Sequence, residues 1–336
     1  QSYQNLPELI ERTKRKEKWV LDLDFKEEEK FDVLPGTGRY QGPSAFLTIQ
    51  EGCDKFCHFC VVPYTRGAEF SRPPQDVMSE AMKIVSQGSV EITLLGQNVT
   101  AYSAVDHNGK TWTLSDLIRA IADIQSIRRI RYTTSHPIDM TDELITTHME
   151  VKELMPYLHL PVQSGSDNIL KAMNRKHGRE LYFDIIKKLR AARPDIAFSS
   201  DFIVGYPGES DADFADTMDL VNQVGFSECY SFKYSERPGT PAATHQDLLD
   251  DAVKTERLHK LQALLKDQQQ AFLQSQVGKI VDVLVEKPGK LSGQYVGKSP
   301  YMHAVNINDC PAENVGKIVS VKIERASTNT LHGSLT

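Results

Sequence analysis

Three cysteines, Cys53, Cys57 and Cys60, lie within eight positions of one another in the segment IQEGCDKFCHFCVVPYTRG. Thiolates are the ligands of iron–sulfur clusters and of many zinc sites. A structural zinc or an ordinary ferredoxin cluster takes four protein ligands, so three thiolates in one loop leave one metal position open. The spacing therefore predicts an iron–sulfur cluster in which one iron binds an exogenous ligand.

Two other interpretations compete with this cluster. His58 could act as a fourth ligand and complete a zinc site, or the three thiols could be unrelated buried side chains. His58 lies between two of the cysteines, where tetrahedral coordination together with both neighbours would be strained, and no second Cys/His pair follows in the chain. The sequence therefore disfavours zinc.

The other two cysteines, Cys229 and Cys310, stand far apart, which is not the pattern of a disulfide framework. Clustered thiols require a reducing compartment, and we find neither a signal peptide nor an apolar run of transmembrane length. We therefore expect a cytoplasmic globular protein without a membrane partner, with a core that its 40% hydrophobic content allows. The net charge of −6 means that any RNA contact must come from a local patch.

Short apolar runs alternate with helix-period sequence six times along the first three quarters of the chain. This pattern predicts βα units with right-handed crossovers, and hence a curved parallel sheet in an open or closed α/β barrel. The predicted strands are Ala45–Gln50, Glu91–Leu95, Ile130–Thr133, Tyr157–Pro161, Ala197–Val204 and Glu228–Phe232.

Polar residues and glycines follow these strands at the edge where α/β barrels place their active sites. We expect them to converge with the cysteine loop on one pocket, although glycines after strands also make turns and Ser-His-Pro can cap a helix. A hydrogen-bonded structural role is equally open for His136. The strand-end residues are Gly96, Gln97, Asn98, Ser135, His136, Gln163, Ser164, Asp201, Gly205 and Glu209.

The pattern changes after a long predicted helix over residues 250–276, which Gly278 ends. Residues 279–336 alternate apolar and polar positions between turns, which predicts a small antiparallel β-barrel, with a domain boundary near Leu273. This tail holds seven Lys and Arg against five Asp and Glu. The slight positive charge leaves an RNA-binding module and a purely structural cap both open.

The amino-terminal 38 residues are dense in charge and end in turn-forming sequence. We interpret residues 1–38 as a linker, and because the chain begins with Gln we expect further sequence upstream.

The CxxxCxxC motif, with Phe59 before its third cysteine, resembles that of the radical S-adenosylmethionine (SAM) superfamily. The resemblance implies a [4Fe–4S] cluster whose open iron is chelated by SAM, and a 5′-deoxyadenosyl radical that abstracts a hydrogen atom. It also implies cofactor-binding roles for Phe59 and the strand-end residues. Gln97 and Asn98 would then bind the SAM amino group, Asp201 or Glu209 the ribose, and Arg175 the carboxylate, unless Arg175 is simply solvated.

Nearly the whole chain is similar to the methylthiotransferase family of radical SAM enzymes, through the segments VVPYTRG, LLGQNVTAY, TSHP, LHLPVQSGSDNILKAMNRKH, DFIVGYPGES and SERPGTPA. The similarity is greatest to its MiaB-type branch. It implies a radical SAM (βα)6-type partial barrel over residues 39–272 and an OB-like TRAM RNA-binding domain over 273–336. It further implies methylthiolation at C2 of N6-dimethylallyladenosine beside the tRNA anticodon.

The same resemblance implies further partners and contacts. It suggests a monomer that binds a tRNA anticodon stem-loop and receives electrons from a flavodoxin-type donor. Tyr64, Arg66 and Arg72 would contact the substrate, although the two arginines could equally form surface ion pairs.

Two departures from the family pattern stand out. The family carries an amino-terminal domain with three cysteines and a second [4Fe–4S] cluster that delivers sulfur, and residues 1–38 have no such cysteines. We therefore expect this chain alone to cleave SAM without completing methylthiolation. In addition, the tail reads GKSPYMHAV, where the family has GRSP.

Two alternative functions remain at the level of sequence. One is that of a sister methylthiotransferase acting on threonylcarbamoyl-adenosine or on a ribosomal-protein aspartate. The other, from a different class, is that of a non-catalytic RNA-binding protein stabilised by a metal.

Overall fold

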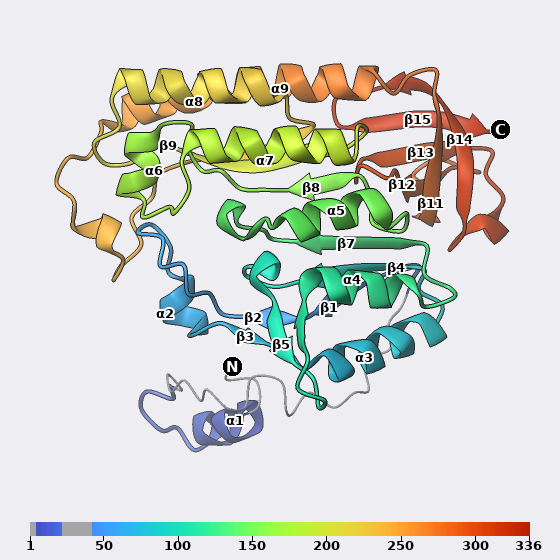
Figure 1. Ribbon diagram of the computed structural model, residues 1–336, viewed down its shortest axis with the longest axis horizontal. Coiled ribbons are helices and arrows are strands. Elements are labelled where there is room, and N and C mark those ends of the chain that lie inside the picture. Colours follow the sequence, from blue (N-terminus) through green and yellow to red (C-terminus); the bar gives the residue numbers. More distant parts are fainter. Residues whose placement is uncertain (1–4, 22–41) are drawn as a thin grey trace.

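The computed structural model describes residues 5–21 and 42–336 (Figure 1). Within the predicted linker, helix α1 spans Leu6–Lys14 and none of its side chains is buried. The rest of that prediction, over residues 1–4 and 22–38, lies outside the described residues. In the described part of the chain, no helix combines the length and the apolar character needed to cross a membrane.

Six parallel strands form the main sheet, in two parts ordered β1-β4-β7 and β8-β9-β10. A parallel bridge between Ile130 and Leu154 joins the two parts. In the described chain β1 pairs only with β4, and β10 only with β9, so the curved sheet stays open as a partial barrel. The prediction of a partial α/β barrel is confirmed. The strands are β1 Ser44–Thr48, β4 Glu91–Leu95, β7 Arg129–Thr133, β8 Tyr157–His159, β9 Ala197–Val204 and β10 Glu228–Lys233.

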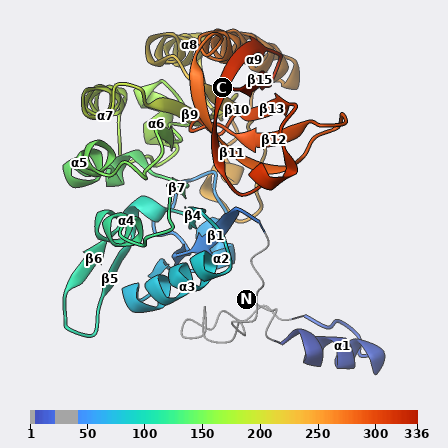
Figure 2. The ribbon, with the colours of Figure 1, turned by 90° about the vertical axis from the view of Figure 1, so that its right-hand side faces the viewer.

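Helices cover the outer face of this sheet (Figures 1 and 2). Alternation along β1 explains why: Ala45 and Leu47 pack with the helices in the main core, whereas Phe46 between them stays exposed on the opposite, inner face. The helices are α3 Pro74–Ser86, α4 Leu114–Ala122, α5 Asp142–Glu150, α6 Asp167–Ala172, α7 Arg179–Ala192, α8 Asp211–Val224 and α9 Asp251–Gln274.

Several short elements decorate the strand ends, and the sequence pattern did not predict them. They are too short to show a clear period, since a two- or three-residue strand contains at most one alternation. These elements are β2 Gln50–Glu51, α2 Val62–Arg66, β3 Phe70–Ser71, β5 Ser103–Val105 and β6 Thr111–Thr113, with 3₁₀ turns η2 Val99–Ala101, η3 Pro137–Asp139, η4 Pro241–Thr244 and η5 Ala312–Asn314.

The carboxyl-terminal segment forms a closed five-stranded barrel in the order β11-β12-β13-β15-β14. The predicted barrel is confirmed, but it is not wholly antiparallel, because β13 and β15 run parallel. The chain leaves β13, crosses the barrel as β14 and returns beside β13, so the first and third of these strands share a direction. The strands are β11 Ile280–Pro288, β12 Tyr295–Lys298, β13 Ala304–Asn308, β14 Ile318–Ala326 and β15 Thr330–Leu335.

In Figure 1, β7 and β8 point away from this small barrel. The small barrel therefore lies at the amino ends of the parallel strands. Arg129 donates hydrogen bonds to the Asp282 and Lys298 carbonyls, both at 2.8 Å. Arg131 donates to the Pro300 carbonyl at 2.8 Å. The barrel therefore closes the floor of the partial barrel and leaves the carboxyl ends of its strands free. The side chain of Leu273, at the end of α9, packs into the small barrel's core; the domain boundary near this residue stays a prediction.

Candidate active site

The cysteine loop begins where β2 ends, beside the carboxyl ends of β1 and β4. Gly52 opens the loop with φ +82°, and a Cβ there would collide with the Ala68 carbonyl. Its N–H donates to Gln97 Oε1 at 2.7 Å, and its carbonyl accepts from Gln50 Nε2 at 2.8 Å. Pairing of β2 with β3 then closes the loop at its far end. The sequence thus anchors Cys53 to the sheet through one glycine and two amide side chains.

The middle of the loop rests on the end of α6. The His58 N–H donates to the Met173 carbonyl at 3.0 Å, and His58 Nδ1 lies 2.9 Å from the Ala172 carbonyl oxygen. Asn174 Nδ2 donates to the Phe56 carbonyl at 2.8 Å. These contacts anchor the backbone and the ring of His58 to the end of α6.

A salt bridge holds the loop to the end of β7. Lys55 Nζ lies 2.8 Å from Asp139 Oδ1, with both side chains largely shielded from solvent. Asp139 also accepts a hydrogen bond from Asn98 Nδ2 at 2.8 Å. The loop that carries the three cysteines is therefore fixed to three different strand ends.

The three thiols are free and partly or fully buried. Burial raises the pKa of the Cys53 thiol to about 11 and raises that of Cys60 above its ordinary value, and each further thiolate nearby adds to the effect. Without a metal the Cys53 and Cys60 thiols are protonated at neutral pH, and cluster binding must displace their protons. The cluster therefore has to compensate for the desolvation of three thiolates.

The donor set fits a three-cysteine iron–sulfur cluster. Among the described residues, no three His, Cys, Asp or Glu side chains are gathered closely enough for a single metal ion. A cluster keeps its cysteine ligands apart by placing iron and sulfide atoms between them, whereas a zinc ion draws its ligands together. Arg175 Nη1 lies 3.5 Å from Cys57 Sγ and supplies a positive charge beside the thiols.

Buried polar atoms without partners surround Arg175. Within the described ranges, Ser135 Oγ, Arg175 Nε and both ring nitrogens of His177 have no hydrogen-bond partner. Such atoms are costly, and a group of them at one place indicates a site for a polar ligand. His136 stacks edge-on against His177, with ring centroids 5.5 Å apart, and so belongs to the same group.

Both of these histidines are neutral at physiological pH. Burial, reinforced by the positive charge of Arg175, lowers the pKa of His136 to about 2 and that of His177 to about 3. Neutral imidazoles can still give or accept hydrogen bonds, but they add no positive charge. The positive charge beside the thiols therefore comes from Arg175.

Other predicted cofactor-binding residues are engaged inside the protein. A Cβ on Gly96 would lie 2.5 Å from Gln50 Oε1, so only glycine allows this approach. Asn98 Oδ1 accepts from Thr100 Oγ1 at 2.9 Å, and the Gln97 oxygen is taken by the cysteine loop. These residues shape the site, and their roles toward SAM stay predictions.

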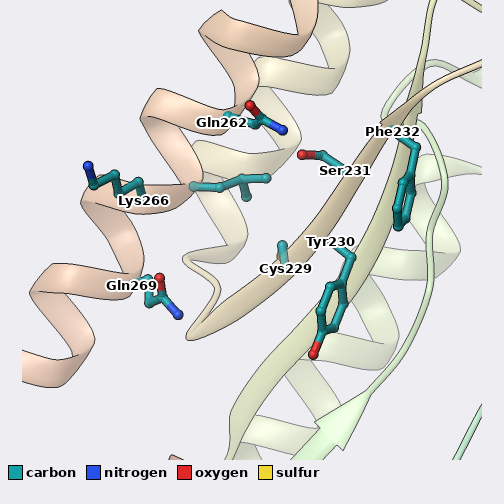
Figure 3. Close-up of a pocket in the computed structure, with 8 residues that line it drawn as sticks. Cys229, Tyr230, Ser231, Phe232, Gln262, Lys266 and Gln269 are labelled. Atoms are coloured by element: carbon teal, nitrogen blue, oxygen red, sulfur yellow. The ribbon is translucent and has the colours of Figure 1, made fainter. Parts of the chain in front are cut away.

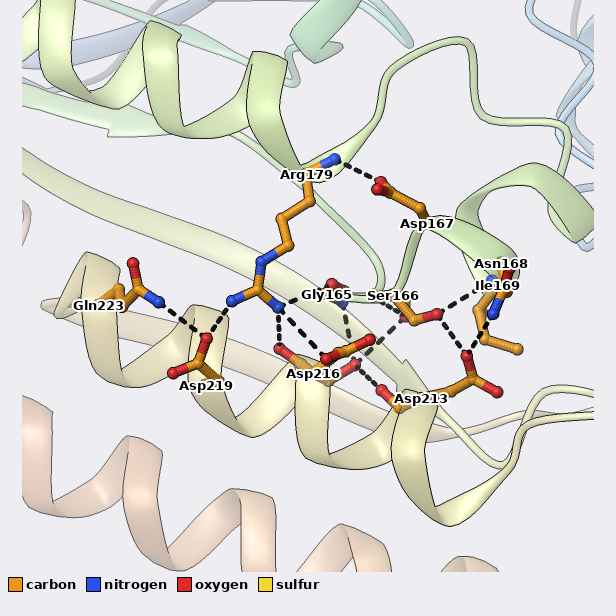
Figure 4. Close-up of polar contacts among 12 residues, drawn as sticks. Gly165, Ser166, Asp167, Asn168, Ile169, Arg179, Asp213, Asp216, Asp219 and Gln223 are labelled. Carbon is orange, nitrogen blue, oxygen red and sulfur yellow. Dashed lines mark hydrogen bonds and ion pairs between the residues drawn. The ribbon is translucent and has the colours of Figure 1, made fainter.

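A polar network that includes Ser166, Arg179 and Asp213 joins α6, α7 and α8 (Figure 4), and Ser164 is hydrogen-bonded to it. The Ser164 hydroxyl lies 3.2 Å from Thr217 Oγ1 and accepts from the Ser166 N–H. Ser166 in turn donates to Asp213, which caps α8. The Gln163 backbone has φ +76° and bonds to the Asp201 carbonyl at 3.0 Å. These two residues turn the chain from β8 into α6.

Glu209 is buried against Arg257 of α9, with Oε1 2.6 Å from Arg257 Nη1, and it also accepts from the Gly205 N–H at 3.0 Å. Gly205 has φ +69°, and a Cβ there would contact Lys254. The sequence reading missed Arg257, which lies 48 residues from its partner in the middle of a helix with no local signal. A ribose-binding role for Glu209 stays a prediction.

The predicted substrate residues differ in exposure. Tyr64 is 48% exposed and packs edge-on against Phe56, and Arg66 forms an exposed ion pair with Glu51 at 3.2 Å. Arg72 is mostly covered and binds Glu80 at 2.7 Å. Phe59 packs on an apolar cluster that includes Met173 and Tyr206. Tyr64 and Arg66 are therefore the accessible members of this predicted set.

A partial (βα)6 barrel with three cysteines in the loop after its first strand, followed by a small β-barrel, defines a radical SAM enzyme with an appended domain. The family described as "Radical SAM superfamily" matches residues 47–221, and the family described as "TRAM domain" matches residues 274–336. The radical SAM family implies a [4Fe–4S] cluster and SAM.

The chain belongs to the tRNA-2-methylthio-N(6)-dimethylallyladenosine synthases, the MiaB-type tRNA methylthiotransferases. It is 58% identical over 335 residues to the synthases of Rickettsia canadensis (strain McKiel) and Rickettsia bellii (strain RML369-C), matching 100% of this chain and 75% of theirs. Among solved structures, coproporphyrinogen III oxidase (HemN) from Escherichia coli, a radical SAM enzyme, has a TM-score of 0.52 at 15% identity. That match covers 88% of this chain and 72% of the oxidase, and it bears on the fold alone.

Proposed function

We propose that this chain carries the SAM-cleaving and RNA-binding parts of an enzyme that adds a methylthio group to C2 of N6-dimethylallyladenosine beside the tRNA anticodon. One observation carries the proposal. Three thiols from one loop lie at the same edge as buried polar atoms of Ser135, Arg175 and His177 that have no hydrogen-bond partner. The relatives' names supply the nucleoside.

The residues at this edge of the sheet have different roles in the proposal. Cys53, Cys57 and Cys60 would hold the [4Fe–4S] cluster, which supplies the electron that splits the SAM sulfonium. Arg175 Nε faces no partner in the described structure and would bind the SAM carboxylate, while Ser135 and neutral His177 would donate or accept hydrogen bonds.

Further partners complete the proposal. The chain spans 75% of the length of its relatives, and sulfur would come from a second [4Fe–4S] cluster on an amino-terminal domain. The electron donor would be of the flavodoxin type, and the enzyme would act in the cytoplasm as a monomer. The small barrel at the strands' amino ends would contact the tRNA.

Anaerobic reconstitution with iron and sulfide tests the first half of this function. We expect a [4Fe–4S] spectrum and formation of 5′-deoxyadenosine from SAM on reduction, without a methylthiolated product. Failure to form 5′-deoxyadenosine would refute the catalytic role. Methylthiolation by this chain alone would refute the need for a second cluster.

Mass spectrometry of tRNA nucleosides from a strain lacking the gene tests the substrate. We expect N6-dimethylallyladenosine to accumulate without its 2-methylthio group. Loss of the methylthio group from threonylcarbamoyl-adenosine instead would assign the chain to the sister activity.

A further inference from the structure

The inner face of the partial barrel carries polar and aromatic side chains that the proposed cofactor site does not use. His159 of β8, Asp201 of β9 and Tyr230 of β10 lie on three neighbouring strands, and Asp201 and Tyr230 are direct partners in the register. Figure 3 shows Tyr230 and Phe232 pointing away from α9, while Cys229 and Ser231 point toward it. Tyr230 therefore faces the inside of the barrel, where it is 50% exposed.

These three side chains lie close together but leave hydrogen-bonding capacity free. His159 Nε2 lies 3.6 Å from Asp201 Oδ2, which is longer than a hydrogen bond. The His159 ring packs edge-on against Tyr230, with centroids 6.3 Å apart, and its Nδ1 is 3.0 Å from Ser199 Oγ. A carboxylate, an imidazole and a phenol ring thus lie next to one another on the inner face without saturating one another's hydrogen bonds.

This wall is near the cysteine loop and open to the outside. Arg175 donates to the Pro161 carbonyl at 2.8 Å, two residues beyond His159, and the same guanidinium lies 3.5 Å from Cys57 Sγ. In the described chain, edge strands β1 and β10 do not pair with each other, so the sheet is not closed on that side. Phe46 of β1 is 67% exposed and Tyr230 of β10 is 50% exposed.

We propose that His159, Asp201 and Tyr230 form the seat of the substrate adenine, an inference that rests on the proposed function. The Asp201 carboxylate accepts from the N6–H, the His159 ring donates to N7, and the Tyr230 ring packs on the base. Recognition through N6 and N7 uses one edge of adenine. It leaves C2, on the opposite side of the ring, free to face the cluster loop.

The neighbouring side chains suit an apolar group on N6. Phe232 is 56% exposed and pairs in register with Ile203, so an apolar surface lies one layer above Asp201 and Tyr230. A dimethylallyl group can pack there. The threonylcarbamoyl group carries a carboxylate, which Asp201 and nearby Glu228 would repel. The wall therefore favours the prenylated nucleoside over its charged counterpart.

This assignment gives Asp201 a different role from SAM ribose binding, and RNA-binding measurements separate the two. The reconstituted chain with SAM but no reductant is titrated with stem-loop RNAs that carry N6-dimethylallyladenosine, adenosine, purine riboside or 7-deazaadenosine at the target position. Purine riboside lacks the N6 amino group, and 7-deazaadenosine lacks N7. We expect the unaltered chain to bind the adenosine loop about tenfold more tightly than either analogue.

Substitutions then assign each contact. D201L should bind the adenosine and purine loops equally, and D201N, which keeps an acceptor oxygen, should restore the preference. H159F should bind the adenosine and 7-deazaadenosine loops equally. S231A, on the same strand but facing α9, should match the unaltered chain, and SAM affinity should be unchanged in every variant.

The outcomes separate this inference from the proposed function. If the unaltered chain binds no stem-loop, the tRNA function itself fails. If it binds but does not distinguish adenosine from purine, or if D201L keeps the distinction, the adenine seat is wrong. If D201L weakens SAM binding and leaves RNA discrimination intact, Asp201 belongs to the SAM site.

Discussion

The two ends of the parallel sheet differ in whether the buried polar groups described here have hydrogen-bond partners. At the amino ends, Arg129 and Arg131 bind carbonyls of the small barrel, and Arg131 Nε also lies 3.1 Å from Glu91 Oε2. At the carboxyl ends, Arg175 leaves Nε without a partner in the described structure, as do Ser135 and His177. Buried charge is thus compensated within the chain at one end and left incomplete at the other.

This difference shows that burial alone does not identify the residues of a ligand site. Arg129 and Arg131 are more buried than Arg175, and by that measure they would look like active-site residues. Their hydrogen-bonding groups are occupied by Glu91 and by backbone carbonyls, so they join two domains. Among these three arginines, unfilled hydrogen-bonding capacity, rather than burial, distinguishes the one that lies beside the cysteine loop.

Removing one thiol should have the largest effect at the carboxyl end. Cys57→Ala leaves only two thiolates for the cluster, so we expect loss of the [4Fe–4S] absorption and of 5′-deoxyadenosine formation. Iron analysis and product chromatography measure both. Cys229→Ala is the matched control, because Cys229 faces α9, and it should keep full iron content. Equal iron content in the two variants would contradict the cluster assignment.

Breaking the ion pair at the amino end should cost stability rather than chemistry. Arg131→Met leaves Glu91 buried with a weakened counter-charge and frees two carbonyls, which should lower the free energy of unfolding by about 3–5 kcal/mol. Urea titration measures the loss. Adding Glu91→Gln should recover part of it, since the remaining charge is removed. Purely additive effects of the two changes would argue against a coupled pair.

Replacing the arginine at the carboxyl end should impair ligand binding and leave stability almost unchanged. Arg175→Met removes a partly buried cation whose hydrogen bonds are incomplete, so the stability of the cluster-free chain should change little. SAM affinity or cluster retention should fall about 10–100-fold, as for residues that support a metal site. Equilibrium binding of SAM to the reconstituted chain measures it. A stability loss as large as that of Arg131→Met would erase the contrast between the two ends.

Lowering the pH should reduce the free energy of unfolding through His177, and by less than Arg131→Met reduces it. The folded pKa of His177, about 3, lies below its unfolded value of about 6.5, so its stabilising contribution is present above pH 6.5 and is lost as pH falls toward 3. One such group gives a slope of about 1.4 kcal/mol per pH unit in that window. His177→Asn should flatten the pH dependence of urea unfolding between pH 6.5 and 4. An unchanged slope would show that His177 is already protonated in the folded chain.

Sequence patterns predicted most of the main architecture, because strands such as Glu91–Leu95 and Ala197–Val204 are long apolar runs between clear helical periods. They did not give the parallel pairing of β15 with β13, where Gly333 allows close approach to the Lys322 carbonyl of β14. They could not show that the Gln97 and Asn98 side chains bind Gly52 and Asp139, and the roles of both residues toward SAM stay predictions. Spacing in the sequence predicts which strand end a residue follows, but it does not predict which neighbouring group its side chain will bind.

The sequence by itself determined the chemistry: three thiols in one loop, a parallel sheet to carry them and a small barrel after it, since these follow from local spacing and periodicity. Only the tertiary structure decided the use of the remaining polar residues. It joined Arg257 to Glu209, Arg131 to the Pro300 carbonyl and His159 to Asp201. The reason is physical, because a polar side chain acts through its nearest partner, and that partner can lie anywhere along the chain.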